Sequence, residues 1–196
     1  MGSKNSRPGT DFAKAQRLQV LTDGVFDPCL PAMPGRLSDI EFCGEWAASA
    51  PSVVCHAPLA LDLGGIAKGY AVDCAVDALI AAGADAGLVN AGGDLRLFGA
   101  RPQTILLRHA NSSYETVVLQ DIALAVSDLE ALHRPPQHRG YYLRVSAAPA
   151  ARGHAAVLAA HAVVADALST CALLCDDERV QRALLAFSAR RVGSVD

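Results

Sequence analysis

The chain has 196 residues, of which 52% are hydrophobic, and a formal net charge of −3, so it is long enough to bury one core and is expected to form a single domain. This charge balance gives no basic field for nucleic acid, and no run of Lys or Arg indicates a membrane-surface patch. No uninterrupted apolar segment approaches the roughly 20 residues that cross a bilayer, which argues against a membrane span.

Residues 1–10 differ in character from the rest of the chain. They are rich in Gly, Ser, Asn and Pro, and they predict a disordered leader or tag ahead of a domain at residues 11–196. They also lack the apolar region of a signal peptide. The chain as given is therefore expected to be cytoplasmic.

The first half of the domain predicts two helices separated by loops and strands. Residues 11–21 place apolar side chains at helical spacing and stop at the turn sequence TDG, which predicts a short helix. Three prolines between residues 28 and 35 then enforce a loop. The β-branched residues of 52–63 fit one or two strands. Residues 66–84 have the apolar spacing of an amphipathic helix closed by Gly83.

The second half of the chain predicts mainly antiparallel strands. The pattern indicates a hairpin at 86–99, strands within 104–110 and 116–127, a loop at 133–140, a strand at 155–160, and helices at 163–174 and 176–187. Strands outnumber helices without regular βαβ alternation. The expected fold class is α+β, with a mostly antiparallel sheet packed against helices.

The stretch LDLGGIAKGYAVD, residues 61–73, places charged residues and glycines at the start of a predicted helix. Asp62 precedes Gly64 and Gly65, a geometry that would expose backbone N–H groups and the positive end of the helix dipole to a phosphate-bearing ligand. Lys68 adds a mobile positive charge on the first turn, and the glycines leave room for the ligand. The alternative is a plain strand-turn-helix connection with a solvated lysine.

A second glycine-rich motif, NAGGD at residues 90–94, lies between the strands of the predicted hairpin. Asn90, Gly92 and Gly93 leave space for a ligand or another part of the chain to approach closely. An ordinary hairpin turn uses the same residue types, because Asn and Gly tolerate positive φ. The motif by itself leaves both interpretations open.

The motif ADALST, residues 165–170, places Asp166 and Thr170 one helical turn apart. Both side-chain oxygens can therefore reach one point. Such a pair suits a hard cation such as Mg²⁺, which takes one or two protein carboxylates beside a substrate phosphate. The alternative is a helix start in which Asp166 lies near the N-terminus and Thr170 packs sideways.

Together, DGVFDP (residues 23–28), LDLGGIAKGYAVD, LVNAGGDLRLFG (residues 88–99) and ADALST resemble the motifs of the ApbE family of FAD:protein FMN transferases. The resemblance covers roughly residues 22–174. It implies an ApbE-like domain that uses Mg²⁺ to cleave FAD at its pyrophosphate, releases AMP, and attaches FMN through a phosphoester bond to a Thr or Ser of a target flavoprotein. It would place the chain on the periplasmic side of the inner membrane if a signal segment was removed.

The resemblance also implies roles for individual residues. The flavin nucleotide would contact positions in the two glycine motifs, namely Asp62, Gly64, Lys68, Asn90, Gly92 and Gly93. The cation would be held by the carbonyl of Gly65 and by the side chains of Asp166 and Thr170. Mg²⁺ would then neutralise the pyrophosphate and stabilise an in-line transition state.

The chain departs from the family pattern in two places. The family motif HxxDPxTG corresponds here to HRPPQHRG, in which His133 and Gly140 keep the spacing while Pro136 and Gln137 replace the aspartate and the proline. His133 is the candidate general base for the acceptor hydroxyl, with a solvated loop histidine as the alternative. The chain also lacks part of the family's N-terminal region. Two other functions therefore stay open: a flavin-binding or scaffold protein without transfer chemistry, and a Mg²⁺-dependent FAD pyrophosphatase.

Overall fold

A five-stranded sheet forms the centre of the computed structural model, which describes residues 8–30, 32–43, 52–108, 113–128 and 154–193. Its strands, in spatial order, are β3 (Gly87–Ala91), β4 (Asp94–Phe98), β7 (Ala123–Asp128), β8 (His154–Ala159) and β9 (Arg190–Val192). All neighbouring strands pair antiparallel. With helices packed on this sheet, the predicted α+β class is confirmed.

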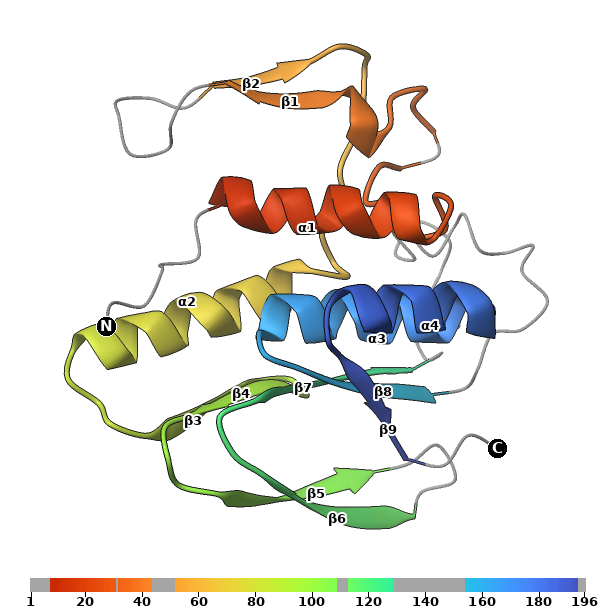
Figure 1. Cartoon of the computed structure of the whole chain (residues 1–196). Coiled ribbons are helices and arrows are strands. Elements are labelled where there is room, and N and C mark those ends of the chain that lie inside the picture. Colours follow the sequence, from red (N-terminus) through yellow and green to blue (C-terminus); the bar gives the residue numbers. More distant parts are fainter. Residues whose placement is uncertain (1–7, 31, 44–51, 109–112, 129–153, 194–196) are drawn as a thin grey trace.

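The helices lie on one side of the sheet (Figure 1). They are α1 (Pro8–Leu21), α2 (Ala67–Ala81), α3 (Ala162–Leu174) and α4 (Asp177–Ala186). Helix α3 contacts β7 and β8 as well as the other three helices, and all of its residues are buried. A helix enclosed in this way must be apolar around most of its circumference. Its polar members, including Asp166 and Thr170, are therefore buried groups that need partners.

Two smaller sheets flank the central layers. Strands β5 (Gln103–Arg108) and β6 (Tyr114–Leu119) pair with each other. Their Leu107 and Leu119 pack with Leu95, Leu97 and Leu124 of the central sheet in a second apolar cluster, on the side away from the helices (Figure 1). Strands β1 (Ile40–Cys43) and β2 (Ser52–Cys55) form the other pair, preceded by the short helix η1 (Leu37–Asp39). None of the helices among the described residues is long and apolar enough to cross a membrane.

The predicted elements agree with this fold except at their boundaries. Helix α1 begins at Pro8 rather than at Asp11. The predicted strand region 116–127 is divided between β6 and β7, which belong to different sheets. The physical reason is Asp121, whose φ of 46° turns the chain between them. Strands β1 and β9 are short and were not predicted from the sequence.

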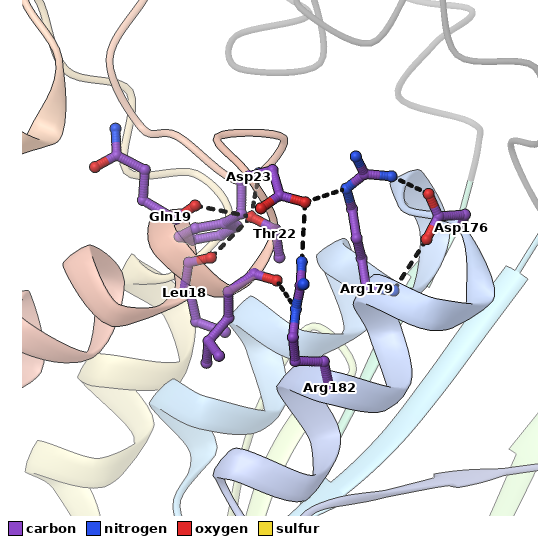
Figure 2. Close-up of polar contacts among 9 residues, drawn as sticks. Leu18, Gln19, Thr22, Asp23, Asp176, Arg179 and Arg182 are labelled. Atoms are coloured by element: carbon purple, nitrogen blue, oxygen red, sulfur yellow. Dashed lines mark hydrogen bonds and ion pairs between the residues drawn. The ribbon is translucent and has the colours of Figure 1, made fainter.

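The turn after α1 is fastened to the start of α4 by polar contacts, which Figure 2 shows. The Arg182 Nε donates to the carbonyl of Leu21 at 2.8 Å, at the open C-terminal end of α1. The carboxylate of Asp23 accepts from both Arg179 and Arg182 at 2.9 Å. Asp176 begins α4 by accepting from the backbone N–H of Arg179. These contacts fix α1 over the helical layer that carries the candidate site.

Candidate functional site

The glycine corner before α2 is closed by its own hydrogen bonds. The carboxylate of Asp62 accepts from the N–H of Gly64 at 2.8 Å, while the Asp62 N–H donates to the carbonyl of Pro28. Gly64 is exposed and Gly65 is buried. The corner is thus tied to the loop that contains DGVFDP, where Asp27 caps a turn by accepting from the N–H of Cys29.

Several backbone N–H groups of this corner, which the sequence predicted to face an anion, already donate within the chain. Those that donate within the chain belong to Gly64, Ile66, Ala67, Gly69 and Tyr70. An N–H that already donates to a protein oxygen has little capacity left for a phosphate. The side chain of Lys68, the helix dipole and a bound cation are further sources of attraction for an anion at this corner.

Helices α2 and α3 cap each other's N-termini through two buried aspartates. Asp166 of α3 accepts from the N–H of Gly69, in the first turn of α2, at 3.0 Å. Asp73 of α2 accepts from the N–H groups of Ala162 and Val163, in the first turn of α3, at 3.0 and 2.9 Å. Each carboxylate satisfies N–H groups that have no partner within their own helix and lies at the positive end of the other dipole.

The two helices approach closely at Gly69. A Cβ built there would fall on the carbonyl oxygen of Ala162 and within 2.8 Å of the Cβ of Asp166. Gly69 lies in regular helix, so its backbone conformation does not require glycine. The close contact with α3 is what excludes a side chain at this position. This contact places the carboxylate of Asp166 at the first turn of α2, which follows Gly65 in the chain.

Lys68 and two carboxylates form the charged centre of the site. The Lys68 Nζ contacts the carboxylate of Asp94, at the start of β4, and lies 3.9 Å from Oδ1 of Asp166. The Lys68 side chain is 49% exposed, whereas those of Asp94 and Asp166 are 1% and 3% exposed. Asp94 was not selected from the sequence. The only signal for it was its position directly after the NAGG turn.

When both buried carboxylates are ionised, they carry more negative charge than Lys68 neutralises. Burial, followed by the charge of Asp94, raises the pKa of Asp166 to about 7. Burial likewise raises the pKa of Asp94, against the opposing effect of Lys68. Oδ1 of Asp94 is buried and has no hydrogen-bond partner among the described residues. These features fit a bound cation, which would supply both the missing charge and a partner for that oxygen.

Thr170 lies one turn after Asp166 on α3 and is buried, so the two predicted side-chain ligands of the cation are on one helix. Between them, Ser169 donates to the carbonyl of Asp166 at 2.9 Å and pairs with Ser127 of β7 at 2.7 Å. No group of three or more His, Cys, Asp or Glu side chains suited to a metal occurs in the described ranges. A cation at Asp166 would therefore complete its shell with hydroxyl, backbone, water or phosphate oxygens, a set that Mg²⁺ prefers.

Asn90, Gly92 and Gly93 build the tight turn between β3 and β4. Oδ1 of Asn90 accepts from the N–H of Gly93 at 3.0 Å, and the two glycines have φ values of 62° and 104°. The turn interpretation of NAGGD is sufficient to explain these residues, and its consequence is to place Asp94 at the start of β4. Their contact with a flavin stays a prediction. His133 and the rest of HRPPQHRG lie outside the described residues.

The elevated pKa of Asp166 predicts how stability changes with pH. The folded chain holds a proton on Asp166 up to about pH 7, whereas the unfolded chain releases it near the ordinary value of about 4. The contribution of Asp166 to stability is therefore fully present below about pH 4 and is lost as the pH rises to about 7. Urea unfolding in the absence of divalent cations should show the decline, and Asp166→Asn should remove that part of it. Equal pH slopes for the two proteins would contradict the assignment.

Comparison with known proteins identifies relatives of this chain. The profile of the ApbE family matches residues 11–190. The fold is similar to that of the flavinyl transferase ApbE of Pseudomonas stutzeri, with a TM-score of 0.69 and 20% identity over 91% of this chain and 65% of that one. It is also similar to a mutant flavin transferase ApbE of Vibrio cholerae (TM-score 0.69, 22% identity, 95% and 70% covered) and to the ApbE protein of Thermotoga maritima (0.66, 23%, 93% and 71%). No curated protein sequence matches. This chain thus spans about two thirds of the length of these relatives.

Proposed function

The chain belongs to the ApbE family, and from this membership and the geometry at Asp166 we propose that it is an FAD:protein FMN transferase. The observation that carries the proposal is the buried carboxylate of Asp166, which α3 places against the first turn of α2 beside Lys68. An enzyme that transfers part of a dinucleotide needs positive charge at the pyrophosphate and a rigid frame around it. The reciprocal capping of α2 and α3 provides that frame.

The proposed reaction breaks the pyrophosphate bond of FAD. The hydroxyl oxygen of a Thr or Ser in the acceptor flavoprotein forms a bond to the phosphorus of FMN, and AMP leaves with the electron pair of the broken P–O bond. The hydroxyl proton passes to a general base, for which His133 is our candidate. Mg²⁺, held by Asp166, Thr170 and the carbonyl of Gly65, would neutralise the phosphates during the displacement.

The residues of this chain have separate tasks in that scheme. Lys68 is half exposed and flexible, so its ammonium can reach a phosphate at the mouth of the site. Gly64 is exposed and has no side chain to exclude the dinucleotide. Asp62 holds the corner in place through Gly64. The exposed Leu61 and Leu63 offer an apolar surface next to the corner, which suits a flavin ring.

Mass spectrometry of an acceptor flavoprotein incubated with the chain, FAD and Mg²⁺ tests the proposal. We expect the acceptor to gain the mass of one FMN, with one AMP released per transfer. An acceptor with Ala in place of the target Thr, and the Asp166→Asn enzyme, should both give no adduct. AMP release without any adduct would indicate an FAD pyrophosphatase, and retained FAD without AMP would indicate a binding protein; either result would contradict transfer.

A further inference from the structure

The carboxylate of Asp94 has a role that hairpin geometry does not explain. Asp94 is 1% exposed. The Oδ1 of its carboxylate is buried and has no hydrogen-bond partner among the described residues. A buried carboxylate oxygen without a partner is strongly unfavourable in a folded protein. Because NAGGD needs only Asn and Gly to form its turn, the turn does not require an acid at this position.

Asp94 and Asp166 come from different layers of the fold but face the same point. Asp94 begins β4 in the sheet, and Asp166 lies in the buried helix α3. The Lys68 ammonium contacts Asp94 and lies 3.9 Å from Oδ1 of Asp166. It therefore occupies the space from which a cation would approach both carboxylates.

We propose that Asp94 is a further residue of the cation site, and that the Lys68 ammonium takes the place of the divalent cation between Asp94 and Asp166 when no cation is bound. Arrival of the cation then displaces Lys68 from the carboxylates. The displaced ammonium can then contact the phosphates of the nucleotide. This inference rests on the proposed function for the identity of the cation, and it assigns Asp94 a role in holding it.

The arrangement explains why these charges are combined in one place. When both carboxylates are ionised, they and Lys68 together carry one net negative charge, whereas a divalent cation would neutralise both carboxylates by itself. Half exposure of the Lys68 side chain gives it a path into solvent. Binding of the cation and release of Lys68 are thus coupled, and removal of the lysine should make cation binding stronger.

Mn²⁺ binding, measured by electron paramagnetic resonance on the full chain without flavin or acceptor, tests this arrangement. We expect Lys68→Met to bind Mn²⁺ more tightly than the natural chain and Asp94→Asn to bind it more weakly, each by roughly 10- to 100-fold. Two matched controls lie beside the opposite end of β4, at exposed positions: Arg101→Met removes a positive charge and Asp85→Asn removes a negative one. Both should bind Mn²⁺ as the natural chain does.

The two variants keep the inference falsifiable even if one fails to fold. Unfolding cannot produce the tighter binding expected of Lys68→Met, so that variant decides the question if Asp94→Asn is unstable by circular dichroism. Unchanged or weaker Mn²⁺ binding by a folded Lys68→Met would overturn the inference. So would natural affinity in Asp94→Asn when Asp166→Asn has lost binding. No flavin is present in these titrations. The Mn²⁺ affinities therefore test the role of Asp94 and Lys68 even if the chain has no transferase activity.

Discussion

Replacing Asp73 with asparagine is expected to lower the free energy of unfolding by about 3–5 kcal/mol, the range for removing one partner of a buried ion pair. Asp73 is 1% exposed and accepts from Ala162, Val163 and the Nη1 of Arg96, the last at 2.7 Å. Asparagine has a single acceptor oxygen and no charge. The variant therefore leaves Arg96 without its buried counter-ion and the start of α3 with an incomplete cap.

Asp77 provides the matched control for this prediction. It lies one turn further along α2 and approaches the same Arg96 at 4.0 Å, but its side chain is 19% exposed. We expect Asp77→Asn to change the free energy of unfolding by less than about 1 kcal/mol, as for a weak ion pair near the surface. Urea denaturation of both variants makes the comparison. Similar losses at the two positions would show that Asp73 acts only through its charge and not through the cap of α3.

Adding one methyl group at Gly69 is the second change with a large expected effect. In Gly69→Ala the new Cβ meets the backbone carbonyl of Ala162 and the Cβ of Asp166, neither of which can rotate away. Overpacking of this kind costs about 1–3 kcal/mol or more, which exceeds the gain of about 1 kcal/mol from alanine in a helix. Separation of the helices would also break the bond from the Gly69 N–H to Asp166. We therefore expect a loss of both stability and Mn²⁺ affinity.

Gly83→Ala is the control that distinguishes steric crowding from the loss of glycine's backbone freedom. Gly83 follows α2 with a φ of 93°, and a Cβ there meets nothing within 4 Å. Gly83→Ala should be destabilised by about 1 kcal/mol, through its backbone conformation alone, and should bind Mn²⁺ normally. Thermal melts and Mn²⁺ titrations of the two variants test this. Normal Mn²⁺ affinity in a folded Gly69→Ala would show that the α2–α3 contact does not position Asp166.

Much of this site could be predicted from local sequence patterns. The spacing of apolar residues predicted α2 and α3, and Gly83 was correctly predicted to end α2. Asp166 and Thr170 were correctly placed on one helix because their separation matches its period. These inferences succeeded since each depends on residues that are close together in the chain.

The partners of these residues could not be predicted in the same way. Gly69 and Asp166 are 97 residues apart, so the reciprocal caps exist only once α2 and α3 have packed. Several of the N–H groups expected to be open at the glycine corner donate to protein oxygens instead, and the bond from Gly69 to Asp166 likewise exists only in the folded chain. Asp94 was missed because a single acid after a glycine turn looks like turn chemistry. Its burial beside Lys68 became visible only in the folded chain.

In the proposed function, Asp166 and Thr170 hold a divalent cation that helps to bind FAD. Calorimetric titration of the chain with FAD, with and without Mg²⁺, tests it most directly. We predict that Mg²⁺ strengthens FAD binding by about tenfold or more in the natural chain and has no effect in Asp166→Asn or Thr170→Val. Equal FAD affinity with and without Mg²⁺ in the natural chain would contradict the claim.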